Sequence, residues 1–273
     1  MSKAVTDISE IRCLPIGFMD SGLGGLSVLK EELRLLPYED FIYYGDSANA
    51  PYGEKSTEEI KRLTFSVTER LTEHGIKGLV IACNTATAAA VRELRCAYPQ
   101  IPIVGIEPAV KPAYEMTRGG RIIVMATPMA IRQEKFRQLI ERYEKLADLV
   151  TMPCGGLMEF VEKGELDGAV LDGYFREHLS PYITHNTETI VLGCTHYPFL
   201  RPHLREFLAG REDIPDIRII DGSRGTAAEM RRRLDECGLL RTDTGRAGVL
   251  TIENSAGDEM VERSYKLLKL PTD

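Results

Sequence analysis

Hydrophobic residues in this chain gather in short uninterrupted runs that alternate with longer amphipathic stretches. A short apolar run without polar interruption is typical of a strand buried on both faces of a parallel sheet. The predicted strands are residues 15–19, 41–44, 78–82, 103–106, 121–126, 148–152, 189–192 and 217–220. Strands that alternate with helices indicate βαβ units, so the pattern predicts an α/β fold with parallel sheets.

The amphipathic stretches between these runs predict helices. They cover residues 26–35, 57–74, 87–97, 129–143 and 226–237. In the second of them, Ile60, Leu63, Val67 and Leu71 follow one another at helical spacing and form a single apolar face. Thr57 is the expected N-cap of that helix, because a threonine hydroxyl can accept a bond from a free first-turn N–H group.

Pairs of residues at strand ends recur in the two halves of the chain at nearly the same spacing. The pairs are Asp20 and Thr127, Tyr44 and Met152, and Cys83 and Cys194. This weak repeat predicts two similar α/β domains. Since Asp221 ends a further apolar run, we expect the chain to return to the first domain near residue 218. The first domain then comprises residues 1–105 plus 218–273 and carries Asp20 and Cys83, and the second comprises residues 106–217 and carries Cys194.

Composition narrows the class of protein. The chain has 273 residues, of which 43% are hydrophobic and 27% charged, as in ordinary globular proteins. Its net charge of −7 argues against nucleic acid or an anionic membrane as a partner. Residues 1–12 are polar and lack the apolar core of a secretory signal. Six cysteines without metal-type spacing favour a reducing cytoplasm over a disulfide framework, and they predict no metal site.

Cys83 and Cys194 are the candidate reactive groups. Each follows an apolar run, and each precedes a segment expected to begin a helix, whose free N–H groups and dipole favour a thiolate. His196 follows Cys194 closely enough to tune its acidity. Either cysteine alone could equally be a small core residue, but a matched pair favours chemistry across a shared cleft. The other four cysteines are interpreted as ordinary, with Cys154 placed in a turn.

A glycine-rich turn, Asp20-Ser21-Gly22-Leu23-Gly24-Gly25, follows the first predicted strand. Its glycines permit close backbone approach, so its N–H groups could bind an anion at the start of the next helix. As a phosphate motif it is weak, because it lacks a Walker lysine and departs from the dinucleotide pattern. A second interpretation is that Asp20 and Ser21 hold an ammonium group while the backbone N–H groups hold a carboxylate.

Six motifs taken together resemble glutamate racemases, which belong to the cofactor-independent aspartate/glutamate racemase superfamily. They are DSGLGGLSV (20–28), YYGDSANAPYG (43–53), IACNTATA (81–88), VGIEPA (104–109), VEKG (161–164) and GCTHYP (193–198). The motifs occur in the family's order over most of the chain. The resemblance implies two parallel-sheet α/β domains related by pseudo-twofold symmetry, with the active site in the cleft between them.

The resemblance also implies the reaction and its residues. Cys83 and Cys194 match the two acid/base catalysts that exchange the α-proton of D-glutamate and L-glutamate, respectively. The positions that match substrate-binding residues are Asp20, Ser21, Tyr52, Gly53, Asn84, Thr85, Thr195 and His196. Glu162 matches a carboxylate near the histidine, although a solvated helix charge is an alternative interpretation. The family supplies D-glutamate for peptidoglycan, uses no cofactor, and often forms homo-oligomers such as dimers.

One departure from the family pattern is visible. Many members carry a second threonine shortly after the position that matches Thr127, whereas here Pro128, Met129 and Ala130 follow. A hydroxyl donor to the substrate is therefore expected to be missing.

Three other functions remain open from the sequence. The chain could be a racemase for aspartate or another amino acid. Cys194 and His196 could instead act as nucleophile and base, although residues so close in sequence seldom orient correctly for this. A module that only binds an amino acid is the third option, but binding needs no second thiol.

Overall fold

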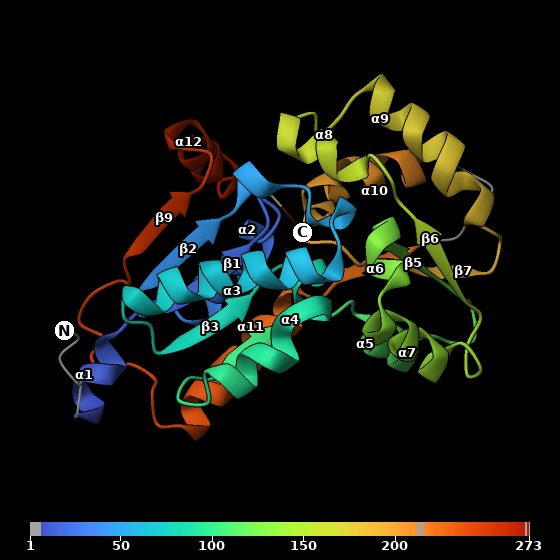
Figure 1. Ribbon diagram of the computed structural model, residues 1–273. Helices are drawn as coiled ribbons and strands as arrows, with labels where there is room; N and C mark the ends of the chain where they lie inside the picture. Colours follow the sequence, from blue (N-terminus) through green and yellow to red (C-terminus); the bar gives the residue numbers. More distant parts are fainter. Residues whose placement is uncertain (1–6, 212–213, 215, 271, 273) are drawn as a thin grey trace.

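The computed structural model of this chain describes residues 7–211, 214, 216–270 and 272, and residues 1–6 of the polar amino-terminal stretch lie outside them. Two parallel sheets lie side by side (Figure 1). In the first, the order is β4-β3-β1-β2-β9, and in the second it is β6-β5-β7-β8. The first-sheet strands are β1 (Ile16–Asp20), β2 (Phe41–Gly45), β3 (Gly78–Ile81), β4 (Ile103–Gly105) and β9 (Leu250–Asn254). The second-sheet strands are β5 (Arg121–Ala126), β6 (Leu149–Pro153), β7 (Thr187–Leu192) and β8 (Arg218–Asp221).

Helices cover both faces of each sheet. The α-helices are α1 (Ile8–Cys13), α2 (Leu26–Leu35), α3 (Thr57–Glu73), α4 (Asn84–Ala97), α5 (Val110–Met116), α6 (Pro128–Arg132), α7 (Glu134–Tyr143), α8 (Leu157–Lys163), α9 (Ala169–Tyr174), α10 (Arg201–Ala209), α11 (Ser223–Glu236) and α12 (Asp258–Leu267). Short 3₁₀ segments include η2 (Tyr52–Glu54) and η5 (Tyr197–Leu200). Among the described residues, no helix combines the length and the apolar character needed to cross a bilayer.

Alternate residues of β1 enter different cores. Phe18 is buried in the core shared with α2 and α11, and Met19 is buried in the core shared with α3 and α4. A strand covered on both sides in this way must be apolar at every position, which explains the uninterrupted hydrophobic runs. The α/β class with parallel sheets, predicted from those runs, is confirmed.

The two sheets repeat one topology. Leaving out β9, strands of the first sheet follow the order 2-1-3-4 by their position in the chain, and strands of the second sheet do the same. This correspondence pairs β1 with β5, β2 with β6, β3 with β7 and β4 with β8. Cys83 and Cys194 therefore follow equivalent strands, as the repeat in the sequence predicts.

The return of the chain to the first sheet was predicted too early. Residue 218 begins β8, and β8 pairs with β7 in the second sheet, because it is the counterpart of β4. The first element to pack against the first sheet is α11, which begins at Ser223 and contacts α2. The division into separate domains stays a prediction, with Asp221 now the last residue of the second part.

Three local predictions also differ from the structure. The hydroxyl of Ser56, and not that of Thr57, accepts the N–H of Glu59 and caps α3. The helix expected over residues 129–143 divides into α6 and α7 at Gln133, whose backbone is extended. Strand β9 was not predicted. Its only fully buried side chain is Ile252, so no apolar run marks it.

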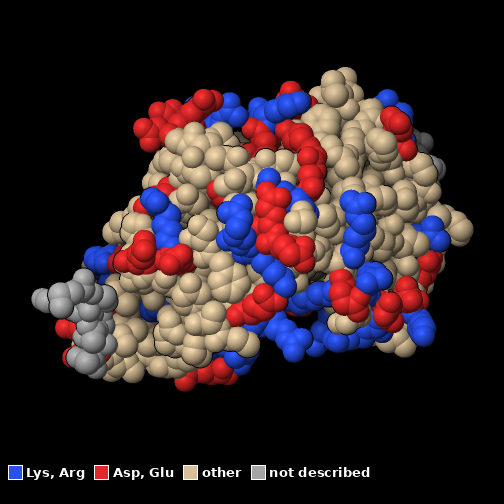
Figure 2. Space-filling view, in the orientation of Figure 1, with Lys and Arg blue, Asp and Glu red and all other residues tan. Residues whose placement is uncertain are grey.

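Charge is mixed on the surface. Figure 2 shows Lys and Arg side chains interspersed with Asp and Glu side chains over the face it presents, and neither sign dominates that face. Among the buried acidic side chains, Glu32 on α2 stands out because both of its carboxylate oxygens lack a hydrogen-bond partner among the described residues. Burial, with a smaller contribution from the charge of Glu39, raises the pKa of Glu32 well above its usual range.

We expect Glu32→Met to stabilise the protein at pH 7 by about 1–3 kcal/mol, because it removes an unpaired buried carboxylate. The pKa of Glu32 is raised in the folded protein, whereas in the unfolded chain it is about 4.3. Near and below that pH the carboxyl is increasingly protonated in both the folded and the unfolded protein, so the stability gained by Glu32→Met should shrink as the pH falls toward 4. Urea unfolding at both pH values measures this. Glu31→Met, which affects a partly exposed pair with Arg34, is the control and should change stability by less than about 1 kcal/mol. An equal effect of Glu32→Met at pH 4 and pH 7 would contradict the assignment.

Candidate active site

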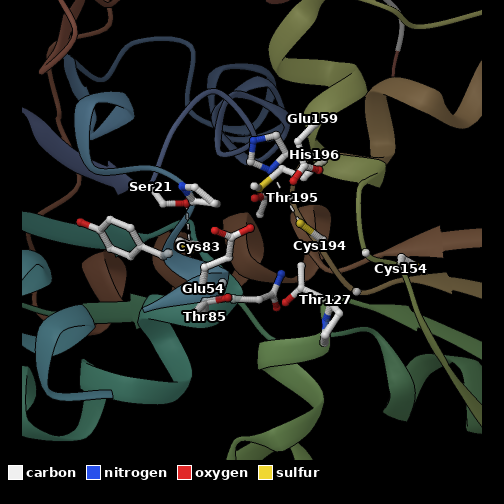
Figure 3. A pocket seen from close by; sticks show the side chains of 18 of the residues that line it. Ser21, Glu54, Cys83, Thr85, Thr127, Cys154, Glu159, Cys194, Thr195 and His196 are labelled. Carbon is white, nitrogen blue, oxygen red and sulfur yellow. Dashed lines mark hydrogen bonds between the residues drawn. The ribbon is translucent and has the colours of Figure 1, made fainter. Parts of the chain in front are cut away.

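A cavity of about 360 Å³ lies between the carboxyl ends of the two sheets. Both halves of the chain line it, and Figure 3 shows Ser21, Cys83 and Thr85 on one side with Cys194, Thr195 and His196 on the other. The predicted site residues that line it are Ser21, Tyr52, Gly53, Cys83, Asn84, Thr85, Thr127, Cys194, Thr195 and His196. In a parallel sheet with this strand order, ligands bind beyond the carboxyl ends of β1 and β3. The cavity lies at that position, as the topology predicts.

Two predicted site residues do not line this cavity. Asp20 is completely buried at the end of β1, behind Ser21. Glu162 lies on α8 and contacts His196. Both therefore lie outside the lining of the cavity, and Glu162 reaches it through His196.

Cys83 is the N-cap of α4. Its sulfur accepts a hydrogen bond from the N–H of Ala86 at 3.5 Å and donates one to the Ser21 hydroxyl at 3.4 Å. Burial, and then the charge of Asp20, raise the pKa of the Cys83 thiol to about 12. A pKa this high favours the protonated thiol at neutral pH, and the thiol lies at a helix N-terminus.

Asn84 and Thr85 form the first turn of α4, beside Cys83. The N–H groups of a first turn have no partner within the helix, and they carry the positive end of its dipole. These N–H groups allow this wall of the cavity to bind an anion. The side-chain oxygen of Asn84 is buried and makes no hydrogen bond among the described residues, so it can accept one from a donor on a ligand.

Cys194 belongs to a chain of three polar groups. Its sulfur lies 3.7 Å from Nδ1 of His196, and Nε2 of His196 lies 2.7 Å from Oε1 of Glu162. Burial opposes the charged form of His196, but its contacts with Cys194 and Glu162 outweigh burial and raise its pKa well above the usual range. Burial likewise opposes ionisation of Glu162, yet the hydrogen bond and charge of His196 lower its pKa. A charged imidazolium–carboxylate pair thus stands beside the second thiol.

The glycine-rich turn joins the two halves and does not form an open anion site. The N–H of Gly22 is bonded to Asp20 Oδ2, and the N–H of Leu23 is bonded to Glu162 Oε1 at 3.0 Å. A Cβ atom on Gly24 would lie 2.6 Å from Oγ1 of Thr195 and still closer to His196. The glycines allow the backbone of the first half to touch the loop of the second half that carries Thr195 and His196.

Asp20 has an unusual environment for a carboxylate. Its Oδ2 accepts from the N–H of Gly22 at 2.9 Å, whereas its Oδ1 has no partner among the described residues. Burial raises the pKa of Asp20, and the positive charge of His196 only partly offsets this effect. The Tyr43 hydroxyl donates chiefly to the carbonyl of Gly22, which fixes the turn around Asp20.

The hydroxyl of Tyr52 is directed away from the cavity. It donates to Oδ2 of Asp46 at 2.7 Å, and the side-chain amide of Asn49 donates to the same carboxylate. The part of this segment free to meet a ligand is therefore the backbone at Tyr52 and Gly53. Gly53 lies opposite Thr127 and Met129 of the second half.

Several residues that line the cavity were not predicted as site residues, although Pro51 and Gly193 lie inside the quoted motifs. The others are Glu54, Pro128, Arg132, Cys154, Gly155, Gly156, Met158 and Glu159. Among these, Cys154 had a signal in the repeat: it follows β6 just as Asp46 follows β2, so the repeat places it near the site. Burial, and then the charge of Cys194, raise the pKa of Cys154 to about 12. Within the described residues, no cluster of three or more His, Cys, Asp or Glu side chains could hold a metal ion.

Comparison with known proteins places this geometry in a family. The Asp/Glu/Hydantoin racemase family matches residues 17–230. A glutamate racemase of Clostridium botulinum (strain Alaska E43) is 48% identical over 255 residues, which cover 93% of this chain and 97% of that protein. A glutamate racemase isoform from Bacillus anthracis superposes with a TM-score of 0.83 at 30% identity, over 95% of this chain and 96% of that one. The Francisella tularensis glutamate racemase, solved with D-glutamate, gives a TM-score of 0.79 at 27% identity, over 95% of each chain.

We expect Gly24→Ala to destabilise the protein by about 1–3 kcal/mol, because the new methyl group must displace Thr195 and His196 from a packed contact. Unfolding in urea measures the change. Gly173→Ala on α9 is the matched control, since a Cβ atom there meets no atom and alanine favours a helix. Equal stability of the two variants would show that the contact at Gly24 is loose.

Proposed function

The chain belongs to the glutamate racemases of the Asp/Glu/Hydantoin racemase family, and we propose that Cys83 and Cys194 interconvert L-glutamate and D-glutamate by a two-base proton transfer. Membership of this family makes the protein an isomerase. One observation carries the proposal: two buried thiols follow equivalent strands of the two sheets and line a single cavity. A substrate between them presents one face of its Cα to each sulfur.

The proposed step conserves protons. In the L-to-D direction, the Cys194 thiolate takes the proton from Cα and becomes a thiol, while the bonding electron pair remains on the substrate as a carbanion. The Cys83 thiol then gives its proton to the opposite face and becomes a thiolate. The reverse direction restores the first state. The protonated form of Cys83 in this structure suits its role as proton donor to the D face.

Thiols alone do not explain removal of this proton. The α-proton of an amino acid is less acidic than a thiol by on the order of 10–20 pKa units, which corresponds to roughly 14–28 kcal/mol. The cavity must therefore stabilise the carbanion and its adjacent carboxylate. The first turn of α4 at Asn84 and Thr85, together with the Thr195 side chain, can hold the α-carboxylate, and their N–H and O–H groups can stabilise charge that develops on it.

The remaining polar groups suit the other ends of glutamate. Ser21, supported by the buried Asp20, lies where it can bind the α-ammonium group. The backbone at Tyr52 and Gly53, with the Thr127 hydroxyl opposite, can bind the side-chain carboxylate. Thr127 already accepts the N–H of Ala130, so its own O–H is free to donate into the cavity.

The cellular role is part of this proposal. D-glutamate from this reaction would supply peptidoglycan synthesis in a bacterial cytoplasm, without a cofactor. Assembly into a homo-oligomer stays a prediction.

We expect Cys83→Ser and Cys194→Ser each to lower the racemisation rate by about 100- to 10,000-fold, the usual contribution of a positioned acid or base. Circular dichroism of glutamate, without added pyridoxal phosphate or metal, measures inversion, and mass spectrometry in D₂O measures exchange at Cα. Each variant keeps one base, so Cys83→Ser should still introduce deuterium into L-glutamate, and Cys194→Ser into D-glutamate, without inversion.

The control for the cysteine variants is Cys96→Ser, which changes an exposed thiol on α4 and should racemise glutamate at the normal rate. Undiminished inversion by either active-site variant would refute the two-base mechanism. Binding of glutamate without any deuterium uptake by the natural protein would indicate a binding module instead.

The raised pKa of Cys83 predicts slow alkylation of the free protein at neutral pH. Well below its pKa, the thiolate fraction grows tenfold per pH unit, so labelling of Cys83 by iodoacetamide should rise about tenfold per unit from pH 7 to pH 9. Peptide mass spectrometry after short incubations measures the rate. A labelling rate independent of pH over this range would show that Cys83 is already a thiolate.

A further inference from the structure

Arg132 is the only lysine or arginine among the described residues that line the active-site cavity. It is the last residue of α6, the short helix that Thr127 caps. Its guanidinium makes no hydrogen bond or ion pair with any part of the chain that the structure describes. The side chain is exposed, so it can adopt a new position when a ligand enters.

Acidic side chains surround the same cavity. Glu54 on η2 and Glu159 on α8 both line it, and Figure 3 shows the Glu54 carboxylate directed inward. One carboxylate oxygen of Glu159 is buried without a partner in the described residues. These negative charges oppose the binding of a substrate that carries a second carboxylate, unless a cation offsets them.

The rest of α6 offers little to a distal carboxylate. Between Thr127 and Arg132, the helix presents Pro128, Met129, Ala130 and Ile131, none of which has a side-chain donor. Arg132 therefore provides the next donor on this wall. A guanidinium is also well suited to a carboxylate, because it can donate two parallel hydrogen bonds.

We infer that Arg132 binds the side-chain carboxylate of the substrate and selects dicarboxylic amino acids over amino acids with neutral side chains. The inference rests on the proposed function and specifies its substrate recognition. Since the distal carboxylate keeps its charge throughout proton transfer, the contact is equally strong in the ground state and the transition state. Such an interaction lowers KM and leaves kcat nearly unchanged.

The test compares Arg132→Met and Arg132→Lys with the natural protein, using L-glutamate and D-glutamate. Loss of a charge-assisted contact should raise the KM of Arg132→Met about tenfold or more, with kcat altered much less. Arg132→Lys keeps the charge without the paired geometry and should fall between the two. Arg137→Met is the matched control. It removes an arginine from the neighbouring α7, where it pairs with Glu134 outside the cavity, and should leave KM unchanged.

Glu54→Gln, alone and combined with Arg132→Met, distinguishes substrate binding by Arg132 from neutralisation of Glu54 by Arg132. If Arg132 served only to neutralise Glu54, Arg132→Met would raise KM in the natural protein but not in the Glu54→Gln background, where no charge is left to neutralise. We expect Glu54→Gln to leave KM unchanged or lower it, because a repelling charge is lost. An unchanged KM in Arg132→Met, or a KM in the double variant equal to that of Glu54→Gln alone, would overturn the inference, while glutamate racemisation by the natural protein upholds the proposed function. Failure of the natural protein to racemise glutamate would overturn both.

Discussion

A close contact between a backbone turn and the side chains opposite it holds this active site together. The turn runs from Gly22 to Gly24, and the side chains of Thr195 and His196 pack directly against it. The glycines place no side chain of their own in this contact, and the Ser27 hydroxyl adds a 2.9 Å hydrogen bond to the carbonyl of Thr195. Since each half supplies one thiol, the geometry of the pair depends on this contact. The glycines are required here because the backbone of the turn lies close to Thr195 and His196, and not because the turn binds an anion.

Glu162 takes part in the same contact and also influences the charge of the groups in the site. One of its oxygens accepts from Leu23 in the first half and lies within hydrogen-bond distance of His196 in the second. The backbone carbonyl of Glu162 also accepts from Arg263 on α12. The carboxylate therefore orients the histidine beside Cys194 and secures the glycine turn at once. A positive His196 in turn partly offsets the cost of burying Asp20, so groups from both halves share one charge balance.

The sequence was sufficient where burial leaves a continuous pattern. The apolar runs predicted strands β1 to β8 to within a few residues, and the runs are most continuous in the central strands β1, β3, β5 and β7. Strand β9 is an edge strand with Thr251 exposed, so its pattern resembles that of a loop. The break at Gln133 carries neither glycine nor proline, the residues that usually signal such a break. The motif residues predicted for the site were mostly found together, whereas Glu54, Glu159 and Arg132 have no local signal, because only the folding of separate helices brings them to the cavity.

The two sheets share one strand order, yet the two walls of the cavity differ: Cys83 is held by Ser21 and a helix N-terminus, and Cys194 stands beside His196. Mirror-image amino acids have the same free energy in water, so the equilibrium constant of a racemisation is one. The ratio kcat/KM must then be identical for both enantiomers at every pH. Unequal walls can therefore give the two directions different kcat values only if the KM values differ by the same factor. The asymmetry of the pocket can thus change the saturating rate and the half-saturating concentration of each enantiomer, and it cannot favour the production of either.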